Sequence, residues 1–162
     1  MNNHRFFKKY YWNFLLNSCN QHGFHSPFVY HLTTECFYKG SKKEGILLRL
    51  INYLNLKSVY FHTAILAAEN DDFKELIRMD TPSKSEIIVI TNGIQNYKDY
   101  QEIATQLQDQ CLLLLKNPYE NPDLINTIEQ NNTSKVIINI YDYVFIFRKD
   151  GQVAQNFKIR FF

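Results

Sequence analysis

The chain has 162 residues, a length that suits one domain with a workable core and leaves no room for a second large one. Hydrophobic residues make up 45% and charged residues 21%, with only 5 Gly and 4 Pro, which excludes disordered and fibrous classes. The net charge is +2, and because only three basic residues (Arg5, Lys8 and Lys9) form the basic N-terminal arm, we expect no nucleic-acid partner.

Three helices are predicted in the first third of the chain. Through residues 4–18, apolar and aromatic residues recur at spacings of three and four with charged residues between them, which predicts an amphipathic helix. Ser26-Pro27 is a typical helix start, because Ser accepts from a first-turn N–H and Pro has no N–H to lose; it predicts a helix to about residue 37. The same periodicity predicts a third helix over 46–54.

Beyond residue 55, short β-branched runs alternate with polar helical stretches, which is typical of βα units and a largely parallel sheet. Strands are predicted at residues 58–61, 86–91, 110–115, 135–140 and 143–148, with a last one near 157–161. Helices are predicted near residues 71–79, 97–107 and 122–130. The runs at 87–90 and 112–115 are continuously apolar, which predicts the two central strands. The interpretation is one domain, 1–162, with a helical cap (1–55) and an α/β core (56–162).

Cysteines and hydropathy indicate the compartment. Cys19, Cys36 and Cys111 are odd in number and form no Cys-x-x-Cys pair, so neither a disulfide framework nor a standard zinc site is suggested. Lys8, Lys9 and Asn13 interrupt the first apolar run, and no stretch approaches the roughly 20 apolar residues of a membrane span. We expect a soluble, cytoplasmic protein with no membrane partner.

Two stretches carry a family resemblance. Residues 22–30 have the sequence HGFHSPFVY, and residues 86–162 follow a strand, helix and hairpin pattern that ends in VFIFR (144–148) and FKIRF (157–161). Together they resemble a bacterial group of class I S-adenosylmethionine (SAM)-dependent methyltransferases, in which a His-Gly-x-His-Ser-Pro-Phe-Val segment precedes the catalytic fold. The resemblance implies an α/β fold with a shortened Rossmann-like methyltransferase sheet, mostly parallel with an antiparallel C-terminal hairpin, plus an N-terminal helical cap.

The cofactor half of that family is missing from this sequence. A SAM site in this fold needs a glycine-rich turn after the first strand, because only residues without a side chain let the backbone approach the cofactor. Here no glycine occurs between Gly45 and Gly93. The stretch between Phe61 and Asn92 is only about as long as one βαβ unit, roughly 30 residues, so we expect the ribose-binding strand to be deleted.

The family's acidic positions are also replaced. Its Asp-Gly-Asn-His turn after the fourth strand corresponds here to Asn-Gly-Ile-Gln at 92–95, and its Asp-Asp pair followed by Ile-His corresponds to Lys-Asn-Pro-Tyr at 116–119. An ammonium group cannot ligate a hard divalent cation, so Lys116 removes any metal site of the family type. We therefore expect no bound metal and no SAM cofactor.

The candidate site residues fall into two sets. A remnant cleft at the carboxyl ends of the strands is predicted from His62, Thr63, Asn92 and Gly93. A possible ligand or partner edge is predicted from His22, His25, Ser26, Lys116 and Asn117. The spacing of Cys19, His22, His25 and His31 is also compatible with a zinc cluster, but lone His-x-x-His pairs are common, and a structural role is the preferred interpretation.

The leading hypothesis is a degenerate methyltransferase-like protein without catalytic activity. It would bind a partner protein or form a homodimer through the aromatic N-terminal helix, whose exposed rings exceed what monomers usually tolerate. The aromatic residues are Phe6, Phe7, Tyr10, Tyr11, Trp12 and Phe14. The alternative is a divergent SAM-dependent methyltransferase, or another small-ligand enzyme, that uses the remnant cleft.

Overall fold

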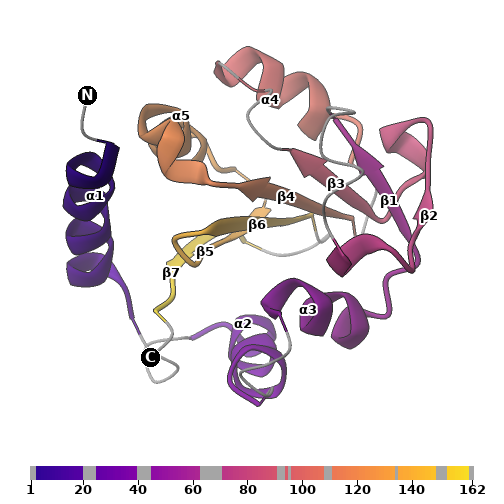
Figure 1. Ribbon diagram of the computed structural model, residues 1–162, viewed down its shortest axis with the longest axis horizontal. Helices are drawn as coiled ribbons and strands as arrows, with labels where there is room; N and C mark the ends of the chain where they lie inside the picture. The colour runs from indigo at the N-terminus through magenta and orange to yellow at the C-terminus, as the bar shows by residue number, and fades with distance from the viewer. Residues whose placement is uncertain are drawn as a thin grey trace.

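A computed structural model describes residues 3–19, 25–39, 45–62, 71–90, 94, 96–107, 111–133, 135–148 and 153–160, with side chains from Tyr10 onward. Within these residues the chain forms a three-layer α/β structure, in which a seven-stranded mixed sheet has helices on both faces (Figure 1). The predicted α/β class is confirmed.

The strand order of the sheet is β2-β1-β3-β4-β6-β5-β7. The strands are β1 (Ser58–Phe61), β2 (Ile77–Arg78), β3 (Ile87–Ile90), β4 (Leu112–Lys116), β5 (Lys135–Asn139), β6 (Tyr143–Arg148) and β7 (Gln155–Lys158). Among the described strands, β6 alone is antiparallel to its neighbours, and it forms a tight hairpin with β5. The apolar runs of β3 and β4 are buried at the centre, as predicted.

Each α-helix of the described residues lies where the sequence predicts one. They are α1 (Asn3–Asn17), α2 (Pro27–His31) with the π-helical continuation η2 (Leu32–Phe37), α3 (Ile46–Leu54), α4 (Tyr97–Ala104) and α5 (Pro122–Gln130). Ser26 caps α2 by accepting a 3.5 Å hydrogen bond from the Val29 N–H. Asn96 and Asn121 cap α4 and α5 in the same way, so each cap satisfies one N–H of a first turn.

Two apolar cores lie on the two faces of the sheet. On one face α2, η2 and α3 cover Val59, Ile87 and their neighbours; on the other, α4 and α5 cover Ile88, Leu113 and theirs. Figure 1 shows α1 apart from both layers, beside the β5–β7 side of the sheet. After α1 the chain returns to that edge, where Cys19 forms a parallel bridge with Ile159 just beyond β7.

The predicted helix at 71–79 is wrong. The segment forms a short 3-10 helix, η4 (Asp71–Phe73), and then the two-residue strand β2. The reason is tertiary: Phe73 is buried against Phe61, and the Ile77 N–H donates to the Lys57 carbonyl at 2.8 Å, so strand pairing overrides local helix propensity.

Two expectations about the sheet also need correction. The segment between Phe61 and Asn92, where a strand was expected to be deleted, contains the two-residue strand β2, which pairs in parallel with β1 at the edge of the seven-stranded sheet. The last strand lies at Gln155–Lys158 rather than near 157–161, and it pairs in parallel with β5.

Candidate functional site at the carboxyl edge of the sheet

In open α/β sheets, ligands bind outside the carboxyl ends of the parallel strands. In this chain that edge is formed by the residues that follow β1, β3, β4 and β5. Of the predicted cleft residues, only His62 is described, while Thr63, Asn92 and Gly93 lie outside the described residues. His22 of the predicted partner edge lies outside them as well.

His62 lies on an open groove between β1 and α4. Its backbone N–H donates to the Val89 carbonyl at 3.0 Å, which continues the pairing of β1 with β3. The groove has a volume of about 320 Å³ and is lined by Tyr60, His62, Pro82, Asp99, Glu102, Ile103 and Gln106. That volume is within the range of ligand pockets. The Asp99 carboxylate also accepts a hydrogen bond from the Asn96 side chain, so it is part of the start of α4.

Lys116 and Asn117 end β4 at a sharp turn. Asn117 has φ 50°, in the left-handed region that Asn tolerates, and its N–H donates to the Asp142 carbonyl at 3.0 Å. The chain then enters the 3-10 helix η6 (Pro118–Glu120). Lys116 and Asn117 line a pocket of only about 50 Å³ against Leu115 and Leu124. That pocket is far smaller than the roughly 300–1,000 Å³ of small-molecule sites.

Aromatic rings cover the carboxyl edge next to β4 and β5. Tyr119 of η6 and Tyr141 of the β5–β6 turn stack with centroids 4.8 Å apart. Phe14 of α1 contacts both rings, at 6.3 and 5.5 Å, and is only 4% exposed. Tyr10 and Tyr11 of the same helix approach Tyr119 and Tyr141 at 6.0 and 4.9 Å. The N-terminal helix therefore closes this part of the edge with its own side chains.

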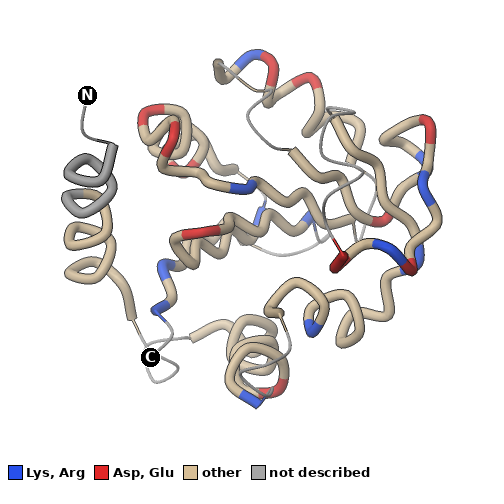
Figure 2. Tube along the Cα trace, in the orientation of Figure 1, with Lys and Arg blue, Asp and Glu red and all other residues tan. Residues whose placement is uncertain are grey.

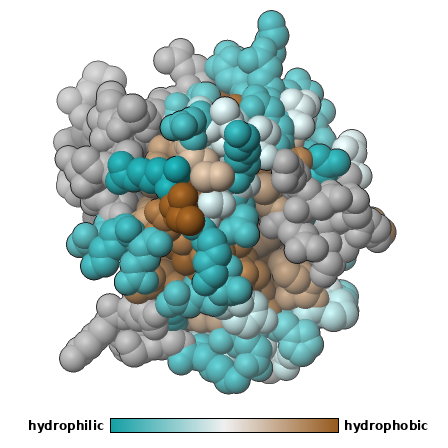
Figure 3. All heavy atoms as spheres, turned by 90° about the vertical axis from the view of Figure 1, so that its right-hand side faces the viewer, coloured by the Kyte–Doolittle hydropathy of each residue, from teal (hydrophilic) through white to brown (hydrophobic). Residues whose placement is uncertain are grey.

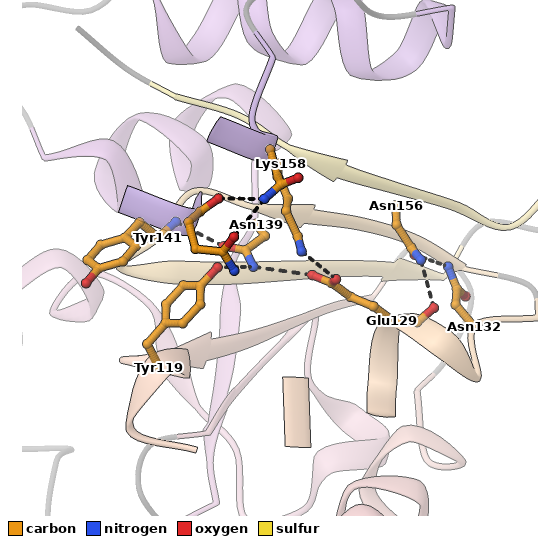
Figure 4. A network of polar contacts seen from close by, with 9 residues as sticks. Tyr119, Glu129, Asn132, Asn139, Tyr141, Asn156 and Lys158 are labelled. Carbon is orange, nitrogen blue, oxygen red and sulfur yellow. Dashed lines mark hydrogen bonds and ion pairs between the residues drawn. The ribbon is translucent and has the colours of Figure 1, made fainter. Parts of the chain in front are cut away.

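A buried polar network supports these rings (Figure 4). Asn139, fully buried at the end of β5, donates from Nδ2 to the Tyr119 hydroxyl at 3.2 Å and to Glu129 Oε1 at 3.3 Å. Its Oδ1 accepts from the Tyr141 N–H at 3.0 Å. Glu129 Oε2 forms an ion pair with Lys158 Nζ of β7 at 3.0 Å. Burial is the main cause that raises the pKa of Tyr119 to about 12, so this phenol stays protonated at neutral pH.

The same network continues along α5 and β7. Asn156 of β7 donates to the Glu129 carbonyl at 2.7 Å and accepts from the Asn132 side chain at 2.7 Å (Figure 4). Asn132 also accepts from the Lys135 N–H at the start of β5. These contacts attach the last strand to α5 and β5, and they have a structural role.

The two halves of the predicted partner edge are not brought together. Ser26 is buried as the cap of α2, and His25 beside it is exposed. The Phe28 ring, two residues after Ser26, packs on Phe147 at 5.2 Å, and Phe147 pairs with Leu112 at the start of β4. Lys116 pairs with the other end of β6. The structure therefore places Ser26 and Lys116 near opposite ends of the same strand pair.

Charges and hydropathy add little to the site. Charged residues are spread over the described chain, and the described side chains of α1 are uncharged (Figure 2). Seen from the β2 side, apolar atoms are visible among hydrophilic ones (Figure 3), and Ile77 of β2 is 67% exposed.

Among the described residues, no three His, Cys, Asp or Glu side chains are grouped to hold a metal ion, and none of the helices has the length and hydropathy to cross a membrane.

The residues that shape this edge are not among the candidates that the sequence predicts. Tyr119, Tyr141 and Asn139 meet through contacts between distant parts of the chain. One signal is present in the sequence: Asn139 interrupts the otherwise apolar run at 136–140, and a polar residue in a buried strand needs a hydrogen-bond partner.

Comparisons of the chain with protein families, with curated proteins and with solved structures found no match.

Proposed function

We propose that this chain is a degenerate methyltransferase-like protein that does not transfer methyl groups and acts by binding a partner protein or a second copy of itself. One observation carries the proposal. The carboxyl edge beside β4 and β5, next to the predicted cleft, is occupied by Phe14, Tyr119 and Tyr141. A protein that keeps the sheet but covers this part of its carboxyl edge with its own side chains is better suited to binding through its surface than to turnover.

The form of the sheet supports the likeness to a methyltransferase. The resemblance of the sequence implies a mostly parallel sheet with an antiparallel hairpin near the C-terminus. Among the strands that the structure describes, β6 is the one antiparallel strand, and it lies between the parallel strands β4 and β5. Such a sheet alone does not specify an activity, because one fold hosts many functions.

The chemistry of the edge supports the loss of catalysis. Lys116 stands where the family has a carboxylate, and the pocket beside it has a volume of about 50 Å³. A space of that size admits a few water molecules, not a nucleoside cofactor. Tyr119, the ring of this aromatic cover at the end of β4, does not act as a base at neutral pH, because burial raises the pKa of its phenol to about 12.

Calorimetry with SAM and with S-adenosylhomocysteine tests the proposal. We expect no binding tighter than a dissociation constant of about 10 μM, or roughly −7 kcal/mol. A tighter constant for either ligand would overturn it. ATP at the same concentration serves as a control, because it shares the adenosine group and reports any unspecific nucleotide affinity.

A second candidate function rests on the groove beside His62. Its volume of about 320 Å³ suits a small ligand, and it lies at the end of β1, as a divergent SAM-dependent enzyme requires. This alternative predicts that SAM binds and that His62→Ala weakens the binding at least tenfold. The same titrations therefore separate the two candidates.

A further inference from the structure

Helix α1 is attached to the protein outside its two apolar cores. Among the described side chains of α1, Phe14 alone is buried, with 4% of its surface exposed. Its ring packs on Tyr119 and Tyr141, and these three residues are not part of the core on either face of the sheet. Figure 1 shows α1 apart from both layers. Removal of α1 therefore leaves both cores intact.

The sequence of α1 makes it a weak helix by itself. Among its 15 residues are three Asn and six aromatic residues, types with lower helix propensity than Ala, Leu or Lys. Its first turn has no acidic residue and its last turn no basic residue, so neither end complements the helix dipole. An isolated helix of about 15 residues is marginal in water even with favourable residues. Helix α1 therefore depends on its docked side chains and unfolds when it leaves the protein.

The surface beneath α1 is formed and held by other parts of the chain. We call the stacked rings of Tyr119 and Tyr141 the aromatic platform. Asn139 donates to the Tyr119 hydroxyl at 3.2 Å and accepts from the Tyr141 N–H at 3.0 Å. The Asn117 N–H donates to the Asp142 carbonyl at 3.0 Å, which joins the turn after β4 to the turn between β5 and β6. These contacts do not involve α1, so the platform stays ordered without it.

The chain is fixed again shortly after α1. The Cys19 N–H donates to the Lys158 carbonyl at 2.8 Å, and the Cys19 carbonyl accepts from the Arg160 N–H at 3.3 Å. This anchor follows the last helical residue by two positions. Lys158 pairs with Asn139, which holds the platform. An undocked α1 therefore remains tethered close to the platform, and its redocking is intramolecular.

We infer that α1 is a detachable lid that unfolds off the aromatic platform as a unit while the sheet and both cores stay folded. Elements with few buried contacts open at a lower free energy than the whole domain. Among its described side chains α1 has one buried ring, whereas every residue of β3 is buried. The lid controls access to the platform at the carboxyl edge. That a partner uses this access rests on the proposed function of the chain as a binding protein; the opening itself does not.

Amide hydrogen exchange of the full chain, followed residue by residue by NMR, tests the lid. We expect the protection factors of the α1 amides to be at least tenfold lower than those of β3 and β4. Low concentrations of urea should leave the exchange of α1 almost unchanged and accelerate that of β3 and β4, because undocking exposes far less surface than global unfolding does.

Phe14→Ala and Trp12→Ala are a matched pair of variants on α1, since Phe14 is buried and Trp12 is 64% exposed. We expect Phe14→Ala to lower the protection of the α1 amides at least tenfold, while the Tyr141 N–H and the amides of β3 and β4 remain protected. The Tyr141 N–H reports on the platform, because it donates to Asn139 and not to α1. Trp12→Ala should change the protection of α1 by about threefold or less.

Two outcomes would overturn the inference. One is exchange of the α1 amides with the same protection and the same urea dependence as β3 and β4, which makes α1 part of the global unfolding unit. The other is loss of protection at the Tyr141 N–H or in β3 and β4 when Phe14→Ala releases α1, which shows that the platform or the cores depend on the lid. SAM titration of the same samples reports the proposed function separately, because SAM binding by a chain whose lid opens refutes the binding role alone.

Discussion

Tyr119 and Tyr141 stack with their ring centroids 4.8 Å apart, although one follows β4 and the other connects β5 to β6. This contact joins two connections at the carboxyl edge of the sheet. Phe14 packs on both rings, so α1 is attached to the protein through an aromatic cluster rather than through the two main cores. The following predictions test this arrangement.

Phe14→Ala is expected to lower the free energy of unfolding by about 3 kcal/mol, because truncating a buried Phe loses transfer energy and leaves a cavity. Urea denaturation at low micromolar protein concentration measures the effect. Trp12→Ala is the matched control, since its ring is 64% exposed on the same helix and its loss should cost less than about 0.5 kcal/mol. Similar losses in the two variants would show that α1 is not docked through Phe14.

Asn139→Leu is expected to cost about 2–4 kcal/mol, because at a fully buried position it removes the acceptor of the Tyr141 N–H and the donor to Glu129 Oε1. Chemical denaturation measures the loss. Asn156→Ala removes hydrogen bonds from an exposed side chain of the same network and should cost about 1 kcal/mol or less. An Asn139→Leu variant as stable as the unaltered chain would contradict a structural role for the network.

Tyr119→Phe should change how stability depends on alkaline pH. Burial raises the pKa of Tyr119 to about 12 in the folded protein, above the ordinary value of 10.0. The contribution of this phenol to stability is therefore complete below pH 10 and is lost as the pH rises toward 12, because only the unfolded chain releases the proton freely.

The measurement is urea unfolding of the protein and of Tyr119→Phe at pH 8, 10 and 11. We expect the free energy of unfolding of the variant to fall less steeply above pH 10. Both proteins still lose some stability in this range, because burial also raises the pKa of Tyr100. Tyr30→Phe, at a 45% exposed ring, is the control and should keep the slope of the unaltered chain. Identical slopes in the protein and in Tyr119→Phe would contradict the burial of this hydroxyl.

The purified protein is expected to carry no stoichiometric divalent metal, because under the proposed likeness to a methyltransferase Lys116 and Asn117 stand at the positions of an acidic pair, and an ammonium group repels a cation. Elemental analysis of protein purified without chelator measures the metal content. A value near one metal ion per chain would refute the prediction, provided that it persists after removal of any affinity tag.

Several elements of the fold were predictable because their signals act over a few residues. The Ser26-Pro27 start of α2 and the periodicity of α3 and α5 come from capping and from the repeat of the helix. The apolar runs of β3 and β4 identify strands covered on both faces. The local signal failed at 71–79, where pairing of β2 with β1 decides the conformation.

The sequence by itself determined the α/β class, the central strands and most of the helices. Only the tertiary structure decided which surfaces meet. The docking of α1 on Tyr119 and Tyr141, the position of Asn139 beneath them and the pairing of β7 with β5 join residues that are far apart in the chain. Periodicity and capping specify which face of an element is apolar, whereas the partner of that face depends on how the whole sheet is assembled.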